Sequence, residues 1–212
     1  MTFFPIACGG CKEPLSSRPQ YLLCPLCAQA IADNPDDEKL KLPSGGICYA
    51  PYLLGGPLEM MIWAAKFRGR TDLGPALAEL LINAPKTSAM IQKCDLLAPV
   101  PLSPIRQFQR GYNQSAEIAH ALAKYHSTPV HRGWQRRHRR AQHQLSRAER
   151  LNNLQGAFKV PKSVENKRVL LIDDVITTGS TVKEATQVLL EAGAKSVDAI
   201  AVAGTNWSYL KT

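Results

Sequence analysis

Apolar residues follow two different periodicities along this chain. Between residues 57 and 82 they recur every three or four positions, which predicts two helices, at 57–67 and 73–82. After residue 94, continuous apolar runs typical of buried strands alternate with amphipathic helical patterns. We expect the strands at 95–100, 168–173 and 196–204, and the helices at 114–125 and 180–194. Apolar strands that alternate with helices indicate a parallel sheet with helices on its faces, so the predicted fold class is α/β.

The first 56 residues lack this alternation. Residues 1–30 contain closely spaced cysteines, and residues 33–46 are polar with proline and glycine, which is typical of a linker. Residues 47–54 predict a short strand that is interrupted by Pro51. We therefore expect three parts: a cysteine module over 1–34, a linker with an edge strand over 35–56 and a main domain over 57–212.

The composition of the 212 residues excludes several classes of protein. Hydrophobic residues make up 45% of the chain, which is enough for a core and excludes global disorder. No apolar run approaches the roughly 20 residues of a membrane-spanning helix. The net charge of +9 favours an anionic partner: nucleic acid, nucleotide phosphates or a membrane surface.

The start of the chain and its cysteines together predict a cytoplasmic protein. The first ten residues, MTFFPIACGG, lack the basic flank and the apolar stretch of roughly 7–15 residues that an export signal needs. Without such a signal, six cysteines indicate a reducing compartment, where spaced thiols bind metal more often than they form disulfides.

Four of the cysteines form two CxxC pairs, Cys8 with Cys11 and Cys24 with Cys27. Each CxxC turn presents two sulfurs to one point, and a structural Zn²⁺ site takes four tetrahedral ligands. So small a module cannot bury a core, and metal binding would supply its folding energy. The alternative is two redox pairs or inert thiols. The other two cysteines, Cys48 and Cys94, lie in apolar stretches and are expected in the core.

Positive charge is concentrated in residues 131–150, HRGWQRRHRRAQHQLSRAER, which contain seven arginines and one glutamate. One interpretation is a solvated basic helix or loop, and the other is a segment that grips an anion. Charge alone leaves open whether the anion is a small polyphosphate or a nucleic acid backbone. Trp134 in this stretch is either a half-buried aromatic or a stacking surface for a base.

The strand at 168–173 ends in two adjacent acids, and a hydroxyl-rich loop follows it. Asp173 and Asp174 lie where the carboxyl end of the strand is expected, the edge at which open parallel sheets bind ligands. The loop Thr177-Thr178-Gly179-Ser180-Thr181 then begins a helix, whose backbone N–H groups can hold a phosphate. Acids that accept hydrogen bonds from a diol, next to a phosphate site, indicate a ribose 5-phosphate. The alternative is a capped, solvated strand end.

VLLIDDVITTGST (169–181) resembles the phosphoribosyl pyrophosphate (PRPP) motif of type I phosphoribosyltransferases. With the cysteine-rich N-terminus, three further segments resemble the ComF/GntX family of competence and DNA-utilisation proteins: KFRGR (66–70), PVPLSPIRQFQRGYNQS (99–115) and SRAERLNNLQGAF (146–158). The resemblance implies a type I phosphoribosyltransferase fold, a parallel sheet flanked by helices with a mobile hood, preceded by a small zinc ribbon.

The resemblance also implies roles for individual residues. Asp173 and Asp174 would hold the ribose hydroxyls, and the loop 177–181 would hold the 5-phosphate. The loop 101–111 would face the pyrophosphate, which arrives with Mg²⁺. The hood would be the segment from about 137 to 158. The catalytic candidates are Asp173 and Asp174 together with Arg106 and Arg110, which would stabilise the departing pyrophosphate. Further substrate-binding candidates are Pro101, Lys66 and Arg68, and ordinary surface charge is the alternative for the four cationic residues.

Two functions remain open from the sequence. The first is an enzyme, a Mg²⁺-dependent phosphoribosyltransferase that acts on PRPP and an unknown acceptor. The second is a non-catalytic adaptor that binds a ribonucleotide 5-phosphate or single-stranded DNA with the same fold. The resemblance adds DNA uptake as the setting and a DNA-uptake protein as a possible partner.

Overall fold

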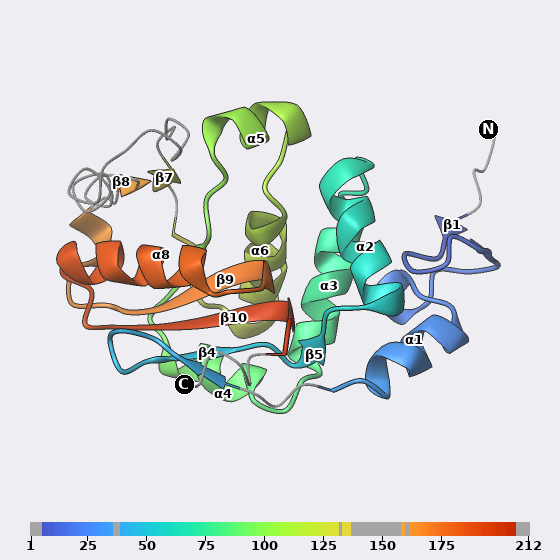
Figure 1. The fold of residues 1–212 in the computed structure, drawn as a ribbon, viewed down its shortest axis with the longest axis horizontal. Coiled ribbons are helices and arrows are strands. Elements are labelled where there is room, and N and C mark those ends of the chain that lie inside the picture. The colour runs from blue at the N-terminus through green and yellow to red at the C-terminus, as the bar shows by residue number, and fades with distance from the viewer. Residues whose placement is uncertain (1–5, 36–38, 132, 137–157, 160–161, 207–212) are drawn as a thin grey trace.

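The computed structural model of the protein describes residues 6–35, 39–131, 133–136, 158–159 and 162–206 (Figure 1). In this part of the chain the main sheet has six strands, in the order β3-β4-β10-β9-β6, with β5 also paired to β10. The strands are β3 (Lys39–Lys41), β4 (Ile47–Tyr49), β5 (Tyr52–Leu53), β6 (Leu96–Pro99), β9 (Arg168–Ile176) and β10 (Ser196–Gly204).

The sheet is mixed rather than wholly parallel. Strands β4, β5 and β9 run parallel to β10, and β6 runs parallel to β9. The exception is β3, which pairs antiparallel with β4 at the edge of the sheet. This strand falls within the predicted linker, where the buried Leu40 and Leu42 alternate with exposed lysines. Part of that linker is therefore an edge strand, which its polar composition hid.

The two faces of the sheet bury two separate sets of apolar side chains. On one face, Leu170 and Ile172 of β9 pack with residues of α2, α3 and α6. On the other face, Val169 and Leu171 pack with α8. Because consecutive residues of a strand point to opposite faces, a fully apolar β9 supplies both sets. Figure 1 shows α8 along one side of β9 and β10, as this division requires.

The predicted helices are confirmed with small changes at their ends: α2 (Gly56–Phe67), α3 (Leu73–Ile82), α6 (Gln114–His126) and α8 (Ser180–Glu191). The predicted strand at 168–173 is longer than expected, because Val175 and Ile176 continue the pairing of β9 with β10. Two short helices of the main domain had not been predicted, α4 (Thr87–Lys93) and α5 (Pro104–Arg110). The second of these occupies most of the expected loop 101–111.

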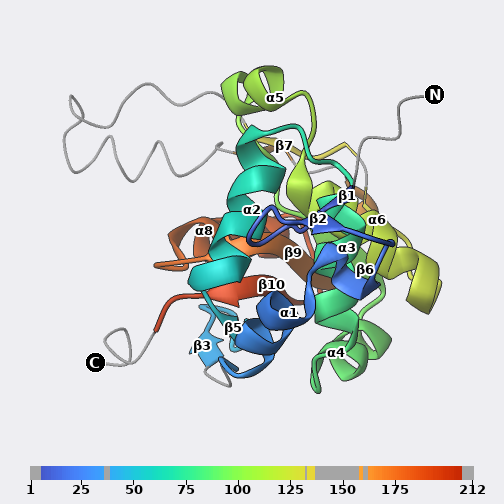
Figure 2. The same cartoon turned by 90° about the vertical axis from the view of Figure 1, so that its right-hand side faces the viewer.

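The cysteine segment packs against α2 and α3 (Figure 2). It contains the strand pair β1 (Ile6–Ala7) and β2 (Pro14–Leu15), the 3-10 turn η1 (Gln20–Leu22) and α1 (Pro25–Ala32). Cys8, Cys27 and Ile31 are buried in the same apolar cluster as Leu58 and Met61 of α2. The segment thus shares a core with the helices that follow it.

Most of the basic stretch 131–150 and of the expected hood, residues 137–157, lies outside the described residues. The short strands β7 (Gln135–Arg136) and β8 (Phe158–Lys159) on either side of it pair antiparallel, and the 3-10 turn η3 (Lys162–Val164) leads into β9. Within the described ranges, no helix has the length and apolar character needed to cross a membrane.

Candidate functional site

Asp173 lies near the carboxyl end of β9, in the interior of the sheet. Its Oδ1 accepts a hydrogen bond of 2.9 Å from the Ser115 hydroxyl at the start of α6 and another of 2.9 Å from the Asp174 N–H. Burial raises the pKa of Asp173 to about 7, and the neighbouring negative charge of Asp174 adds to this rise. The hydrogen bonds and the charge of Lys66 oppose it. Asp173 therefore changes its charge near neutral pH.

Asp174 is buried and is paired with a cation from α2. Its Oδ1 lies 2.9 Å from Lys66 Nζ, and the two side chains are 8% and 22% exposed respectively. A buried carboxylate without a partner is strongly destabilising, so Lys66 compensates for the burial of Asp174. The structure thus brings together two of the residues that the sequence analysis singled out, from distant parts of the chain.

The loop 177–181 curves around a small hollow of about 50 Å³, which Asp173 also lines. Gly179 precedes α8 with φ of +71°, a left-handed conformation that favours glycine. The Thr178 and Ser180 hydroxyl oxygens lie 3.1 Å apart, with exposed side chains. The Ser180 N–H donates to Thr178 Oγ1 at 3.4 Å. The first N–H groups of any helix have no acceptor within it, so those of α8, together with these hydroxyls, can donate to an anion.

A larger cleft of about 770 Å³ adjoins this hollow. The two cavities share Val175 and Thr177 in their linings. Lys66 lines the cleft from α2, and Arg106 and Arg110 line it from α5. Arg110 donates to the Gln114 side-chain oxygen at 3.0 Å, and burial lowers its pKa, although a guanidinium stays charged at any physiological pH. Three cations therefore line one cavity, which adjoins the hollow lined by Asp173 and the loop 177–181.

Two of the substrate-binding candidates lie apart from this group. The Arg68 guanidinium lies 5.0 Å from the ring centre of Trp63, and Arg68 does not line either cavity. Pro101 lines a separate cavity together with Trp134. Trp134 itself is buried and donates its Nε1–H to the Pro99 carbonyl at 2.7 Å.

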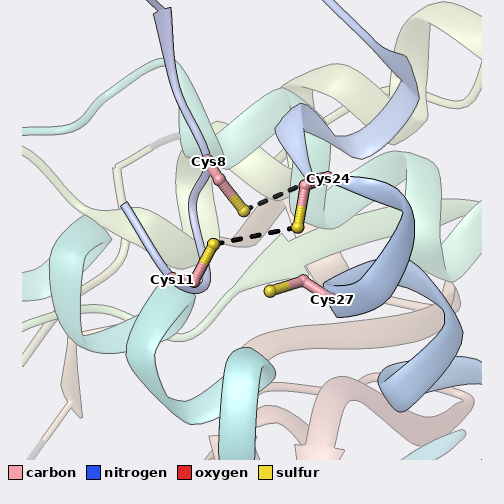
Figure 3. Close-up of side chains that lie close together, drawn as sticks. All are labelled: Cys8, Cys11, Cys24 and Cys27. Atoms are coloured by element: carbon pink, nitrogen blue, oxygen red, sulfur yellow. Dashed lines mark hydrogen bonds between the residues drawn. The ribbon is translucent and has the colours of Figure 1, made fainter. Parts of the chain in front are cut away.

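The four cysteines of the CxxC pairs converge on one point (Figure 3). Their sulfurs all lie within 4.8 Å of one another, and those of Cys11 and Cys24 are 3.8 Å apart. Four thiolates held roughly 2.3 Å from a tetrahedral zinc ion would be about 3.8 Å apart, so the spacing fits this metal. The Cys24 N–H donates to Cys8 Sγ at 3.3 Å, which suits a thiolate. One shared centre favours a metal over two redox pairs.

The remaining cysteines take the places expected of core residues. Cys48 is fully buried in the cluster beneath α8, and burial raises the pKa of its thiol. Cys94 is partly buried, packs against the other cluster and donates its S–H to the Ile91 carbonyl at 3.1 Å.

Comparison with known proteins identifies the family. The family model "Phosphoribosyl transferase domain" matches residues 114–211. DNA utilization protein YhgH of Escherichia coli O157:H7 is 34% identical over 211 residues, which cover 90% of this chain and 86% of that protein. This chain belongs to the ComF/GntX family. Competence protein ComFC of Bacillus subtilis is 36% identical over 194 residues, 88% of this chain and 78% of that protein.

Among solved structures, orotate phosphoribosyltransferase from Francisella tularensis aligns with this ComF/GntX protein over 84% of each chain. The identity is 20% and the TM-score is 0.40.

Sequence reasoning missed several residues that shape the site of this ComF/GntX protein. Ser115 contacts Asp173, and two exposed aromatic residues of α2, Trp63 and Phe67, line the cleft. No local pattern marks these contacts. Helix α5 did leave a readable signal: Ser103 caps its first turn, Pro104 begins it, and Gly111 ends it with φ of +76°.

Proposed function

We propose that this protein binds PRPP with Mg²⁺ at the carboxyl edge of the sheet and transfers its phosphoribosyl group to an acceptor. The observation that carries the proposal is that Asp173 lines the hollow of the loop 177–181, next to a cleft lined by Lys66, Arg106 and Arg110. The neighbouring Asp174 contacts Lys66 of that cleft. The 5-phosphate would accept hydrogen bonds from the N–H groups of the loop. The ribose hydroxyls would donate to the two acids.

The arrangement suits a reaction in which a negatively charged group, pyrophosphate, leaves the sugar. The bond between the anomeric carbon and the pyrophosphate oxygen breaks, and a lone pair of the acceptor forms the new bond to that carbon. Positioning and charge stabilisation are sufficient for such a step, because the acceptor itself is the nucleophile. Arg106 and Arg110, which both line the cleft, would stabilise the departing pyrophosphate. Bound Mg²⁺ would neutralise part of the same charge.

We also propose a role in the cytoplasmic handling of incoming single-stranded DNA, with a DNA-uptake protein as a partner. The names of the relatives, DNA utilization protein and competence protein, support this setting. The net charge of +9 is consistent with a nucleic acid ligand. A non-catalytic adaptor that binds nucleotides or single-stranded DNA is the second candidate, favoured by the same charge.

The first test is calorimetric titration of PRPP with Mg²⁺ into the wild-type protein and into the double variant Asp173→Asn with Asp174→Asn. We expect saturable binding by the wild type and loss of at least tenfold in affinity in the variant, because each acid accepts from a ribose hydroxyl. Zinc content should be the same in both proteins. Glu191→Gln is the matched control, since Glu191 is exposed at the far end of α8.

A parallel titration with a single-stranded oligonucleotide at two salt concentrations tests the second candidate. Saturable PRPP binding, followed by pyrophosphate release with an acceptor, would support the enzyme. Oligonucleotide binding that weakens with salt, in a protein that does not bind PRPP, would contradict the enzyme and support the adaptor. Unchanged PRPP affinity in the double variant would contradict the site.

A further inference from the structure

Two aromatic side chains stand exposed on the α2 wall of the cleft. Trp63 and Phe67 are one helical turn apart, and their ring centres are 5.7 Å apart with planes inclined by 47°. They are 41% and 60% exposed, although the same helix buries Leu58 and Met61 in the core. Large aromatic residues left open on a cavity wall, beside buried neighbours, mark a surface for a ligand rather than for the core.

Each of these rings is paired with a guanidinium. Arg68 lies 5.0 Å from the ring centre of Trp63, and Arg110 lies 4.9 Å from that of Phe67. Aromatic faces next to arginines are what proteins use to stack nucleic acid bases, because each base has a π-face and the arginine adds a cation–π contribution. The chemistry of these two rings, which we call the aromatic wall (Trp63 and Phe67), therefore suits a flat heterocycle.

The cleft also contains a hydrogen-bond acceptor that can discriminate among bases. Glu59 lies four residues before Trp63, one turn earlier on the same helix, and both residues line the cleft. Among the described residues that line it, Glu59 is the only carboxylate. A carboxylate accepts from the exocyclic amino group of adenine, guanine or cytosine and is repelled by the carbonyl oxygen that uracil and thymine carry instead.

The position of the wall connects it with the sugar site. Lys66, on the same helix, lines the cleft and contacts Asp174, and the cleft shares Val175 and Thr177 with the phosphate hollow. We propose that the aromatic wall binds a nucleobase with an exocyclic amino group, stacked on Trp63 and Phe67 and selected by Glu59. This inference rests on the proposed function, because a ribose held by Asp173 and Asp174 places its base in this cleft.

The test compares three ligands by calorimetry with Mg²⁺: ribose 5-phosphate, CMP and UMP. The first has no base, and the other two differ by an amino group in place of a carbonyl oxygen. We expect the wild type to bind CMP about tenfold more tightly than ribose 5-phosphate, because stacking adds to the affinity. In the double variant Trp63→Leu with Phe67→Leu, the affinities for CMP and ribose 5-phosphate should differ by no more than about twofold. The affinity for ribose 5-phosphate should be the same as in the wild type.

Two further variants separate stacking from selection. Glu59→Gln should bring the affinities for CMP and UMP together while leaving ribose 5-phosphate unaffected. Phe108→Leu is the matched control, because Phe108 is a 91% exposed aromatic residue on α5 that lines a different cavity. It should bind all three ligands as the wild type does. The conservative pair Trp63→Phe with Phe67→Tyr should retain most of the preference for CMP.

A competition experiment shows whether the bound base belongs to a free nucleotide or to a nucleic acid strand. If CMP displaces a labelled single-stranded deoxycytidine oligonucleotide, the wall takes bases of a strand. If CMP binds without displacing it, the wall takes a free nucleotide. Both results support the proposal.

Equal affinity of the wild type for CMP and ribose 5-phosphate would overturn the proposal while leaving the sugar site intact. An equal loss of affinity for CMP and for ribose 5-phosphate in the Leu double variant would also overturn it. The aromatic residues would then support the sugar site rather than bind a base. Failure of PRPP and ribose 5-phosphate to bind at all would instead overturn the proposed function, and with it the assigned orientation of the base. Equal affinity for CMP and UMP would overturn the role of Glu59.

Discussion

Gly179 is where the loop 177–181 becomes α8, and two features of its position disfavour a larger residue. Its φ of +71° is costly for any side chain with a Cβ. An added Cβ would also overlap the buried Leu40 side chain of β3, which packs behind the loop. The shape of the loop thus depends on a strand that lies far away in the sequence.

We therefore predict that Gly179→Ala weakens PRPP binding by at least tenfold and lowers the melting temperature by several degrees, since strain of about 1–2 kcal/mol is added. Calorimetry and thermal unfolding would measure the two effects. Gly45→Ala is the matched control: Gly45 has φ of +78°, but open space surrounds its Cβ position. If both variants bind PRPP equally, the overlap with Leu40 does not shape the loop.

The raised pKa of Asp173 predicts how the stability of the ligand-free protein depends on pH. The folded carboxyl holds its proton up to about pH 7, whereas the unfolded one loses it near pH 4. The folded state therefore binds more protons between these values, and stability falls as the pH rises through this window. Asp173→Asn keeps a side-chain oxygen that can accept from Ser115 but has no carboxyl group to titrate. It should therefore remove the loss of stability that Asp173 causes between these pH values.

Melting temperatures at pH 5 and pH 8 would show this difference. The wild type should lose more stability between the two pH values than Asp173→Asn does. Parallel losses in the two proteins would contradict the raised pKa.

At the scale of single elements, α5 depends on its ends. The helix has seven residues, and none of them is buried, so packing contributes little to its stability. Ser103 accepts from the Arg106 N–H at the first turn, and Gly111 ends the helix in a left-handed conformation. These caps hold Arg106 and Arg110 on the wall of the cleft.

We predict that Ser103→Ala weakens PRPP binding about fivefold, because loss of a cap costs about 1 kcal/mol. Ribose 5-phosphate should bind as before, since it has no pyrophosphate for the arginines to contact. Calorimetry with both ligands tests this, and Ser44→Ala at the turn between β3 and β4 is the control. An equal loss for the two ligands would show that α5 does not act through the pyrophosphate.

At the scale of the whole molecule, the cysteine segment and the helices α2 and α3 share one core. Cys8 and Cys27 are buried in the same cluster as Leu73 and Leu77 of α3. The Tyr21 N–H also donates to the Glu79 carboxylate at 3.2 Å. If the four cysteines hold a metal ion, its loss is therefore expected to lower the stability of α2, the helix that carries Lys66.

We predict that Cys24→Ser, or removal of zinc by a chelator, lowers the melting temperature by about 5 °C or more in one cooperative transition. Calorimetric unfolding, with zinc content measured on the same samples, provides the test. Cys94→Ser, at a cysteine outside the cluster of four, should retain zinc and change the melting temperature little. Two separate transitions, with the larger one unmoved, would contradict a shared core.

The local order of residues was enough to predict the longer helices α2, α3, α6 and α8, the strands β6, β9 and β10, the CxxC pairs and the acids that precede a hydroxyl-rich loop. Each of these is a short-range pattern: apolar periodicity, thiol spacing, or a strand followed by a loop and a helix. The same local patterns wrongly predicted a linker at residues 39–41. The buried leucine of this strand lies between two exposed lysines, so the segment is polar in composition.

The contacts that complete the site depend on how the chain folds back on itself. Lys66 meets Asp174, Ser115 meets Asp173, and Leu40 supports Gly179 only after helices α2 and α6 and strand β3 have packed around β9. No local sequence pattern predicts these contacts, because the residues of each pair are far apart in the sequence and belong to different elements. The exposure of Trp63 also depends on tertiary packing. The sequence around Trp63 predicts a helix, but only the packing of that helix leaves Trp63 open to the cleft.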